Sequence, residues 1–95
     1  MGKLFDKLRE LVAADQYLVG EHASERLEER GVMEWQVLAT FGEWQLMEER
    51  PRAKPNPAVE VRATLPDGTD FKVVWSILRV SNVAKLVTVH FFDEE

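Results

Sequence analysis

The spacing of apolar residues changes at Gly42, and this change limits the folds open to this 95-residue chain. Before Gly42, apolar residues recur every three or four positions, as on one face of a helix. After Gly42 they alternate with polar residues, as on a half-buried strand. Helices followed by strands favour an α+β domain in which helices pack on one face of an antiparallel sheet.

Three helices are expected before the change of period. The first covers residues 3–14, the second 21–30 and the third about 33–41, ending at Gly42. Gly31 ends the second helix because glycine accepts the left-handed conformation that closes a helix. The short segment 17–20 is predicted to be an extended link. The apolar stripe of the first helix comprises Leu4, Leu8, Leu11 and Val12.

Roughly four antiparallel strands are expected after the change. They cover residues 44–50, 59–65, 71–78 and 86–92. Prolines keep residues 51–57 out of any strand ladder. The turns are predicted at Pro66-Asp67-Gly68-Thr69 and at Ser81-Asn82. The last strand is apolar on both faces, so we place it inside the sheet and not at its edge.

Composition excludes several classes of protein. The length fits a single domain, 1–95. The absence of cysteine excludes disulfides and thiolate metal sites. No apolar run reaches the ~18 residues of a membrane span. The charged N-terminus lacks the apolar core of a signal peptide, so a cytoplasmic location is expected.

Charge is distributed unevenly along the chain. The net charge is −5, and the acidic excess lies in residues 1–49 and in the last ten residues. Residues 50–85 are basic, and Arg62 and Lys72 are expected on the sheet face that the helices leave open, with Arg79 on it or along its edge. Phosphate binding needs such cations. Alternatively, the acidic and basic faces attract each other across the fold.

His22, Arg26 and Arg30 stand four residues apart and share one face of the second helix. Their donor-rich heads could hold a phosphate or a carboxylate. The alternative is that the arginines pair with Glu48, Glu49 or the C-terminal acids and fix the helix on the sheet.

The segment from His22 to Val32, with the closing Leu86-Val87-Thr88-Val89 strand, resembles a known family. It is similar to a bacterial family of domains of unknown function marked by HAxxRxxxRG, grouped with the RelE-like and MqsR-like toxins of the barnase/EndoU/RelE type of fold. The resemblance covers residues 17–92 and leaves residues 1–16 as an extra N-terminal helix. This chain has Met33 where the family usually has a serine or another capping residue.

The resemblance implies a RelE-like fold and metal-independent cleavage of RNA, as the toxin of a toxin–antitoxin pair. It also implies a small zinc-finger antitoxin as partner, with no cofactor and no metal. The alternative hypothesis is a non-catalytic protein-interaction module that keeps the toxin-like fold. Trp35 and Trp44 flank the third helix and are expected at the surface, where they would stack on RNA bases or contact a partner. The chain would then be a monomer, or a homodimer joined through these two tryptophans.

Cleavage without a metal needs proton transfers and a stabilised phosphorane, which histidine and arginine can supply. The first candidate site is His22 with Arg26 and Arg30. The second lies on the sheet and comprises His90 and Lys72 with Arg62 or Arg79. A sheet edge that met the helix N-terminus would join both histidines in one cleft. The alternatives are a hydrogen-bonded strand histidine and a solvated basic face.

Overall fold

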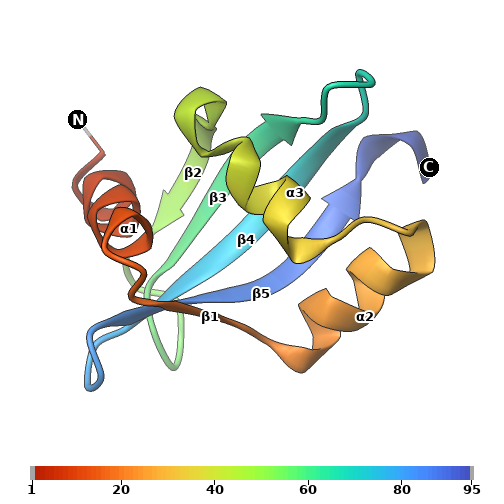
Figure 1. The fold of residues 1–95 in the computed structure, drawn as a ribbon. Coiled ribbons are helices and arrows are strands. Elements are labelled where there is room, and N and C mark those ends of the chain that lie inside the picture. The colour runs from red at the N-terminus through yellow and green to blue at the C-terminus, as the bar shows by residue number, and fades with distance from the viewer. Residues whose placement is uncertain (1, 95) are drawn as a thin grey trace.

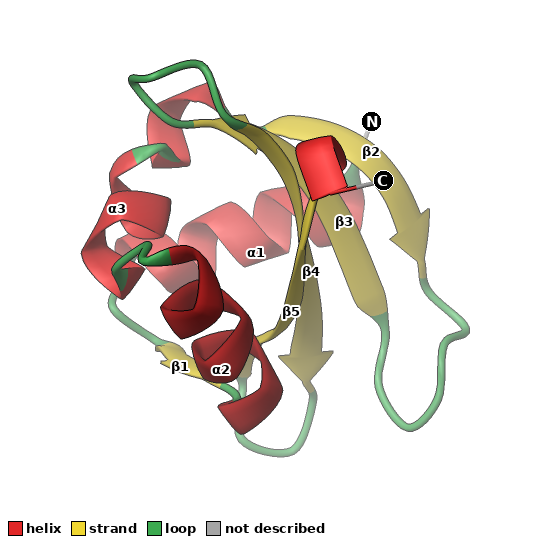
Figure 2. Ribbon diagram, turned by 90° about the vertical axis from the view of Figure 1, so that its right-hand side faces the viewer, coloured by secondary structure: helices red, strands yellow, loops and turns green. Residues whose placement is uncertain are grey.

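The computed structural model describes residues 2–94. In this part of the chain, three α-helices lie on one face of a five-stranded sheet (Figures 1 and 2). The helices are α1 (Lys3–Ala13), α2 (Glu21–Arg30) and α3 (Glu34–Ala39). The strands are β1 (Tyr17–Val19), β2 (Gln45–Arg50), β3 (Ala58–Thr64), β4 (Asp70–Leu78) and β5 (Val83–Phe91). Two short 3₁₀ turns are η1 (Phe41–Glu43) and η2 (Phe92–Glu94). The predicted α+β class is confirmed.

The strands lie in the order β1-β5-β4-β3-β2. Strands β2 to β5 form the predicted antiparallel meander, and β5 is an interior strand as expected. The prediction of four strands was one too few. The segment predicted as a link is β1, which pairs in parallel with Ala84–Leu86 of β5. A strand of three residues is too short to show a pattern of alternating apolar and polar residues in the sequence. Only its pairing with β5 makes β1 recognisable as a strand.

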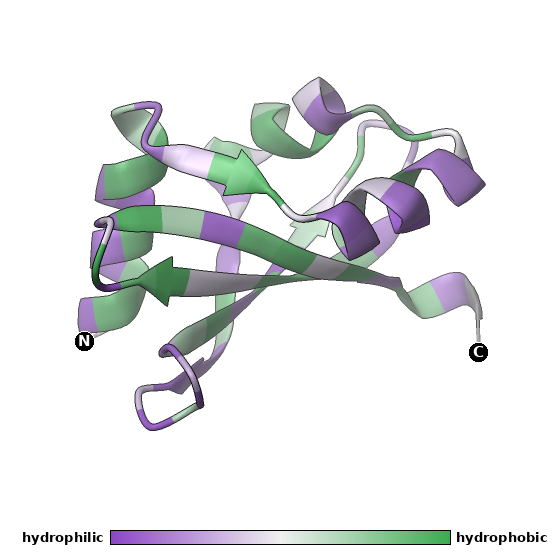
Figure 3. Cartoon of the chain, turned by 90° about the horizontal axis from the view of Figure 1, so that it is seen from below, coloured by the Kyte–Doolittle hydropathy of each residue, from purple (hydrophilic) through white to green (hydrophobic). Residues whose placement is uncertain are grey.

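The core lies between the sheet and the helices. Strand β4 turns alternate side chains inward, and those of Phe71, Val73 and Trp75 are fully buried. The Trp75 ring contacts the Trp44 ring, with 5.5 Å between centroids. Trp44 is therefore a core residue, and its predicted place at the surface was wrong. Helix α2 buries only Ala23 and Leu27, which fits its mostly hydrophilic colouring (Figure 3).

Two local hydrogen-bond patterns end the helices. Gly31 has φ +67°, and the amides of Gly31 and Val32 donate to the carbonyls of Glu28 and Leu27, which closes α2 as predicted. Helix α3 ends at Ala39 and not at Gly42. Its end is fixed by Thr40, whose buried hydroxyl donates to the Val37 carbonyl and accepts from the Trp44 indole nitrogen. No helix among the described residues is both long and apolar enough to cross a bilayer.

Gly31 and Gly42 provide a matched pair of substitutions. A Cβ atom at either position meets nothing within 4 Å, but only Gly31 has a positive φ. Gly31→Ala should therefore lower the free energy of unfolding by about 1 kcal/mol, through backbone strain alone. Gly42→Ala should change it by less than about 0.5 kcal/mol. Urea unfolding measures both, and equal losses would contradict this account of the α2 terminus.

Candidate functional site

Arg26 lies at an edge of the sheet where, within residues 2–94, β5 has no strand partner. Strand β1 pairs with β5 only as far as Leu86, so among the described residues β5 has no strand neighbour on that side beyond this point. Helix α2 runs along this edge, and Arg26 Nε donates to the Val89 carbonyl at 3.3 Å. Arg26 also donates to Glu29 at 2.9 Å. The guanidinium thus binds a backbone carbonyl that would otherwise accept a hydrogen bond from an added strand.

Arg30 extends the same contact by one helical turn. Its guanidinium lies 4.2 Å from the centroid of the Phe91 ring, and it donates to both carboxylate oxygens of Asp93, at 2.8 and 3.1 Å. The hydrogen bonds from Arg30 lower the pKa of the Asp93 carboxyl below its ordinary value. Stacking and bidentate pairing together fix the end of α2 against the end of β5.

The two arginines therefore support the reading in which the stripe fixes the helix on the sheet. One of the predicted C-terminal acids, Asp93, is a partner of Arg30, whereas Glu95 lies outside the described residues. Glu48 and Glu49 were wrong as partners. Glu48 contacts Arg50, and Glu49 accepts a hydrogen bond from the Phe5 amide. Neither can reach α2, because β2 is at the opposite edge of the sheet from β1.

The two histidines lie on different parts of the fold. His22 is exposed in the first turn of α2, on the side of the sheet that carries the helices. His90 is on β5 and shares the register row of Lys72, on the other side. The fold does not bring His22 and His90 into the single cleft that was considered from the sequence.

A row of basic side chains crosses the sheet face that no α-helix covers, here called the open face. Lys72 on β4 stands opposite Arg62 on β3 and opposite His90 on β5. Residues directly opposite on neighbouring strands have Cβ atoms about 5 Å apart and share one face. The sheet therefore brings together three of the four residues predicted for the sheet site. We call Arg62, Lys72 and His90 the basic row.

Arg79 does not join the basic row. It is exposed in the turn between β4 and β5. It follows Lys72 by seven residues along the chain, which corresponds to about 23 Å of extended strand. Of the two alternatives, Arg62 and not Arg79 therefore joins His90, because the hairpin places Arg79 at the opposite end of the sheet.

Carboxylates accompany the basic row on the open face. Glu60 lies on β3, two residues before Arg62, and its Oε1 is 3.4 Å from Lys72 Nζ while its Oε2 contacts Arg50. Arg62 pairs with Asp70. The Thr64 hydroxyl and then Arg62 donate hydrogen bonds that lower the pKa of the Asp70 carboxyl. The face is thus an alternation of fixed cations and anions.

Glu60 is the residue that sequence analysis missed. It is only 4% exposed, and it is the one buried charged side chain among the described residues. Its strand neighbours Val59 and Val61 are buried on the helix side, so alternation alone marks Glu60 as outward and polar. The available signal was its place on the same strand face as Arg62, where an acid beside cations suggests a charged cluster.

The C-terminal 3₁₀ turn adds an aromatic contact to the two outer members of the basic row. The Phe92 ring lies 5.6 Å from the Arg62 guanidinium and 5.6 Å, edge to face, from the His90 ring. Phe92 thereby fixes two members of the row. Among the described residues, no group of three or more His, Cys, Asp or Glu side chains is arranged to hold a metal ion.

Asp93→Asn tests the contact between α2 and β5. The pKa of Asp93 in the folded chain lies below its ordinary value of 3.8. The ion pair with Arg30 therefore stabilises the fold above that pH, and its contribution is lost as the pH falls through the folded pKa. At pH 7 the variant should have the lower Tm. The difference from the wild type should shrink towards pH 2 in thermal unfolding scans.

Arg30→Gln is the matched change on the other side of this pair. The double variant Arg30→Gln/Asp93→Asn should lose less stability at pH 7 than the sum of the two single losses. Additive losses, or a difference in Tm that persists at pH 2, would show that the pair does not hold α2 in place.

Comparison with known proteins identifies a family but no activity. The model of the family described as a domain of unknown function, DUF4258, matches residues 19–91, from the end of β1 to the end of β5. No curated protein and no solved structure matches the chain. The relation to RelE-like and MqsR-like toxins therefore stays a prediction. The chain belongs to the DUF4258 family, whose function is unknown.

Proposed function

We propose that the open face binds RNA and cleaves it without a metal ion. The observation that carries the proposal is the buried carboxylate of Glu60, held by Lys72 and Arg50 beside the basic row. This arrangement places a candidate base beside a histidine and two cations on the open face of the sheet. This combination is what cleavage by the 2′-hydroxyl requires.

The burial of Glu60 costs desolvation free energy. A contribution to the stability of the fold therefore does not explain why a carboxylate is buried there. Removing a carboxylate from water costs several kcal/mol, and an ion pair often fails to offset that cost. Lys72 and Arg62 stand on directly opposed positions, where like charges repel, and Glu60 and Asp70 offset that repulsion. A phosphodiester laid across the row would bring the negative charge that the row attracts.

Each member of the site has one role in the proposed reaction. Glu60 accepts the proton of the ribose 2′-hydroxyl, whose oxygen then forms a bond to phosphorus. His90 gives a proton to the 5′-oxygen as its bond to phosphorus breaks. Lys72 and Arg62 stabilise the charge on the non-bridging oxygens. The products are a 2′,3′-cyclic phosphate and a free 5′-hydroxyl.

The helix stripe has a different role in this proposal. Arg26 and Arg30 hold α2 against β5, the strand that carries His90, and so position the site without contacting RNA. His22 lies outside the site. The toxin–antitoxin assignment, with a small zinc-finger antitoxin as partner, rests on the resemblance alone. A search of the neighbouring genes for a small zinc-finger protein tests it.

An RNA-cleavage assay in EDTA tests the proposed reaction. Glu60→Gln, His90→Asn and Lys72→Met should each lower the cleavage rate by about 100-fold or more, because each removes a proton carrier or a phosphate ligand. His22→Asn is the matched control, since it changes the other histidine of the chain. Its rate should equal that of the wild type.

Two outcomes would contradict the proposal. Equal rates for the wild type and all variants would mean that the cleavage belongs to a contaminant. Loss of cleavage in His22→Asn with normal cleavage in His90→Asn would move the site to α2. Thermal unfolding of each variant separates loss of chemistry from loss of fold. Glu60→Gln should stay folded, because the Lys72 and Arg50 side chains are 28% and 48% exposed and can reach water.

A further inference from the structure

Two large apolar side chains are exposed at the start of α3. Met33 is 62% exposed and Trp35 is 67% exposed, and they stand two residues apart. Scattered apolar residues on a surface need no explanation, but tryptophan is enriched at the energetic centres of protein interfaces. Methionine is common on surfaces that adapt to a partner. The pair therefore marks a candidate contact surface.

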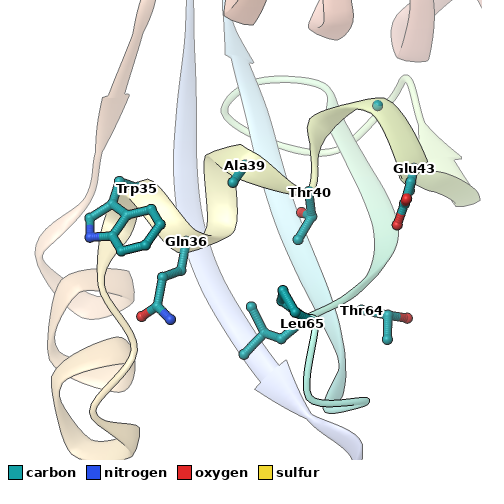
Figure 4. Close-up of a pocket in the computed structure, with 9 residues that line it drawn as sticks. Trp35, Gln36, Ala39, Thr40, Glu43, Thr64 and Leu65 are labelled. Carbon is teal, nitrogen blue, oxygen red and sulfur yellow. The ribbon is translucent and has the colours of Figure 1, made fainter.

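Hollows flank Trp35 on both sides. The first, of about 480 Å³, lies between α3 and the start of the β3–β4 turn (Figure 4). In Figure 4 the side chains of Gln36, on α3, and of Thr40, just after it, extend toward Leu65 across this hollow. The second, of about 570 Å³, lies between α2 and α3 and includes Leu27 and Met33. Trp35 is a lining residue of both hollows.

The rim of these hollows is acidic. Glu28 and Glu34 line the hollow between α2 and α3, and Glu43 lines the other. Among the described residues, no cationic side chain lies within ion-pair distance of any of the three. On α2, Arg26 pairs with Glu29 and Arg30 pairs with Asp93. We call Glu28, Met33, Glu34, Trp35 and Glu43 the α3 surface.

We propose that the α3 surface docks a short basic segment of a partner protein. Lysine or arginine side chains of the partner would pair with the rim, and an apolar side chain would enter a hollow beside Trp35. The rim charge disfavours RNA, which carries the same sign. It also disfavours a second copy of the chain, because a symmetric dimer would bring the same carboxylates together.

This inference is independent of the proposed RNA cleavage. The α3 surface lies on the side of the sheet that carries the helices, whereas Glu60 and the basic row lie on the open face (Figure 2). A failure of one proposal leaves the other standing. Variants of the α3 surface should not change RNA cleavage, and variants of Glu60 should not change docking.

Trp35 itself provides the readout. Of the three tryptophans, Trp44 and Trp75 are buried, so acrylamide quenches mainly Trp35. The probe is a synthetic helical peptide with lysines on one face and leucines on the other, compared with the same peptide carrying glutamates for lysines. Only the lysine peptide should protect Trp35 from quenching, and added salt should weaken the protection.

Charge reversal defines where the peptide binds. Glu28→Lys/Glu34→Lys should weaken binding of the lysine peptide by about tenfold or more, measured by calorimetry. Trp35→Ala should do the same and should stay folded, because the side chain is exposed. Glu10→Lys, an exposed charge reversal on α1, is the control and should bind as the wild type does.

Three results of the peptide experiments would overturn the proposal. They are equal binding of the lysine and glutamate peptides, unchanged binding in Glu28→Lys/Glu34→Lys, and no protection of Trp35 by the lysine peptide. A light-scattering mass of two chains that falls to one in Trp35→Ala would also overturn it, by assigning the α3 surface to a second copy.

Discussion

The unpaired edge of β5 beyond Leu86 is the constraint on which the rest of the fold depends. Strand β1 ends at Val19, and α2 takes the place of a longer strand along that edge. Arg26 binds the Val89 carbonyl, and Arg30 stacks on Phe91 and pairs with Asp93. With the edge covered and the helices on one side, the opposite face of the sheet is left without a helical layer.

The uneven charge of the sequence becomes two separate surfaces, one acidic and one of mixed charge that contains the basic row. The carboxylates of the α3 surface lie on the helix side, and the basic row lies on the open face. The sheet and its apolar core separate them, so they do not neutralise each other across the fold. Ion pairs on the open face form locally instead, as between Arg62 and Asp70. The open face thus carries a group of cations although the net charge of the chain is −5.

The parts of the fold that local chemistry determines could be predicted from the sequence. The end of α2 follows from Gly31, and the β3–β4 turn follows from a proline and a glycine at fixed places. Strand β1 could not be predicted, because its three residues become a strand only through pairing with β5. The end of α3 was misjudged because Thr40, and not a glycine, ends it through a buried side-chain hydrogen bond.

The candidate site was only partly predictable for a related reason. Helical spacing shows that Arg26 and Arg30 share a face, but not what that face contacts. Alternation shows that Glu60, Arg62 and Lys72 point outward, but not that long neighbouring side chains bury Glu60. Which strands are neighbours decides that Arg62, Lys72 and His90 form one row and that Arg79 stays apart.

The most direct test of the open face is an NMR titration of the ¹⁵N-labelled protein with a short single-stranded RNA. The account predicts salt-dependent shifts of the amides of Arg62, Lys72 and His90 and of the His90 ring signals, with His22 unchanged. Shifts centred on His22, Arg26 and Arg30, or no shifts at low salt, would contradict it.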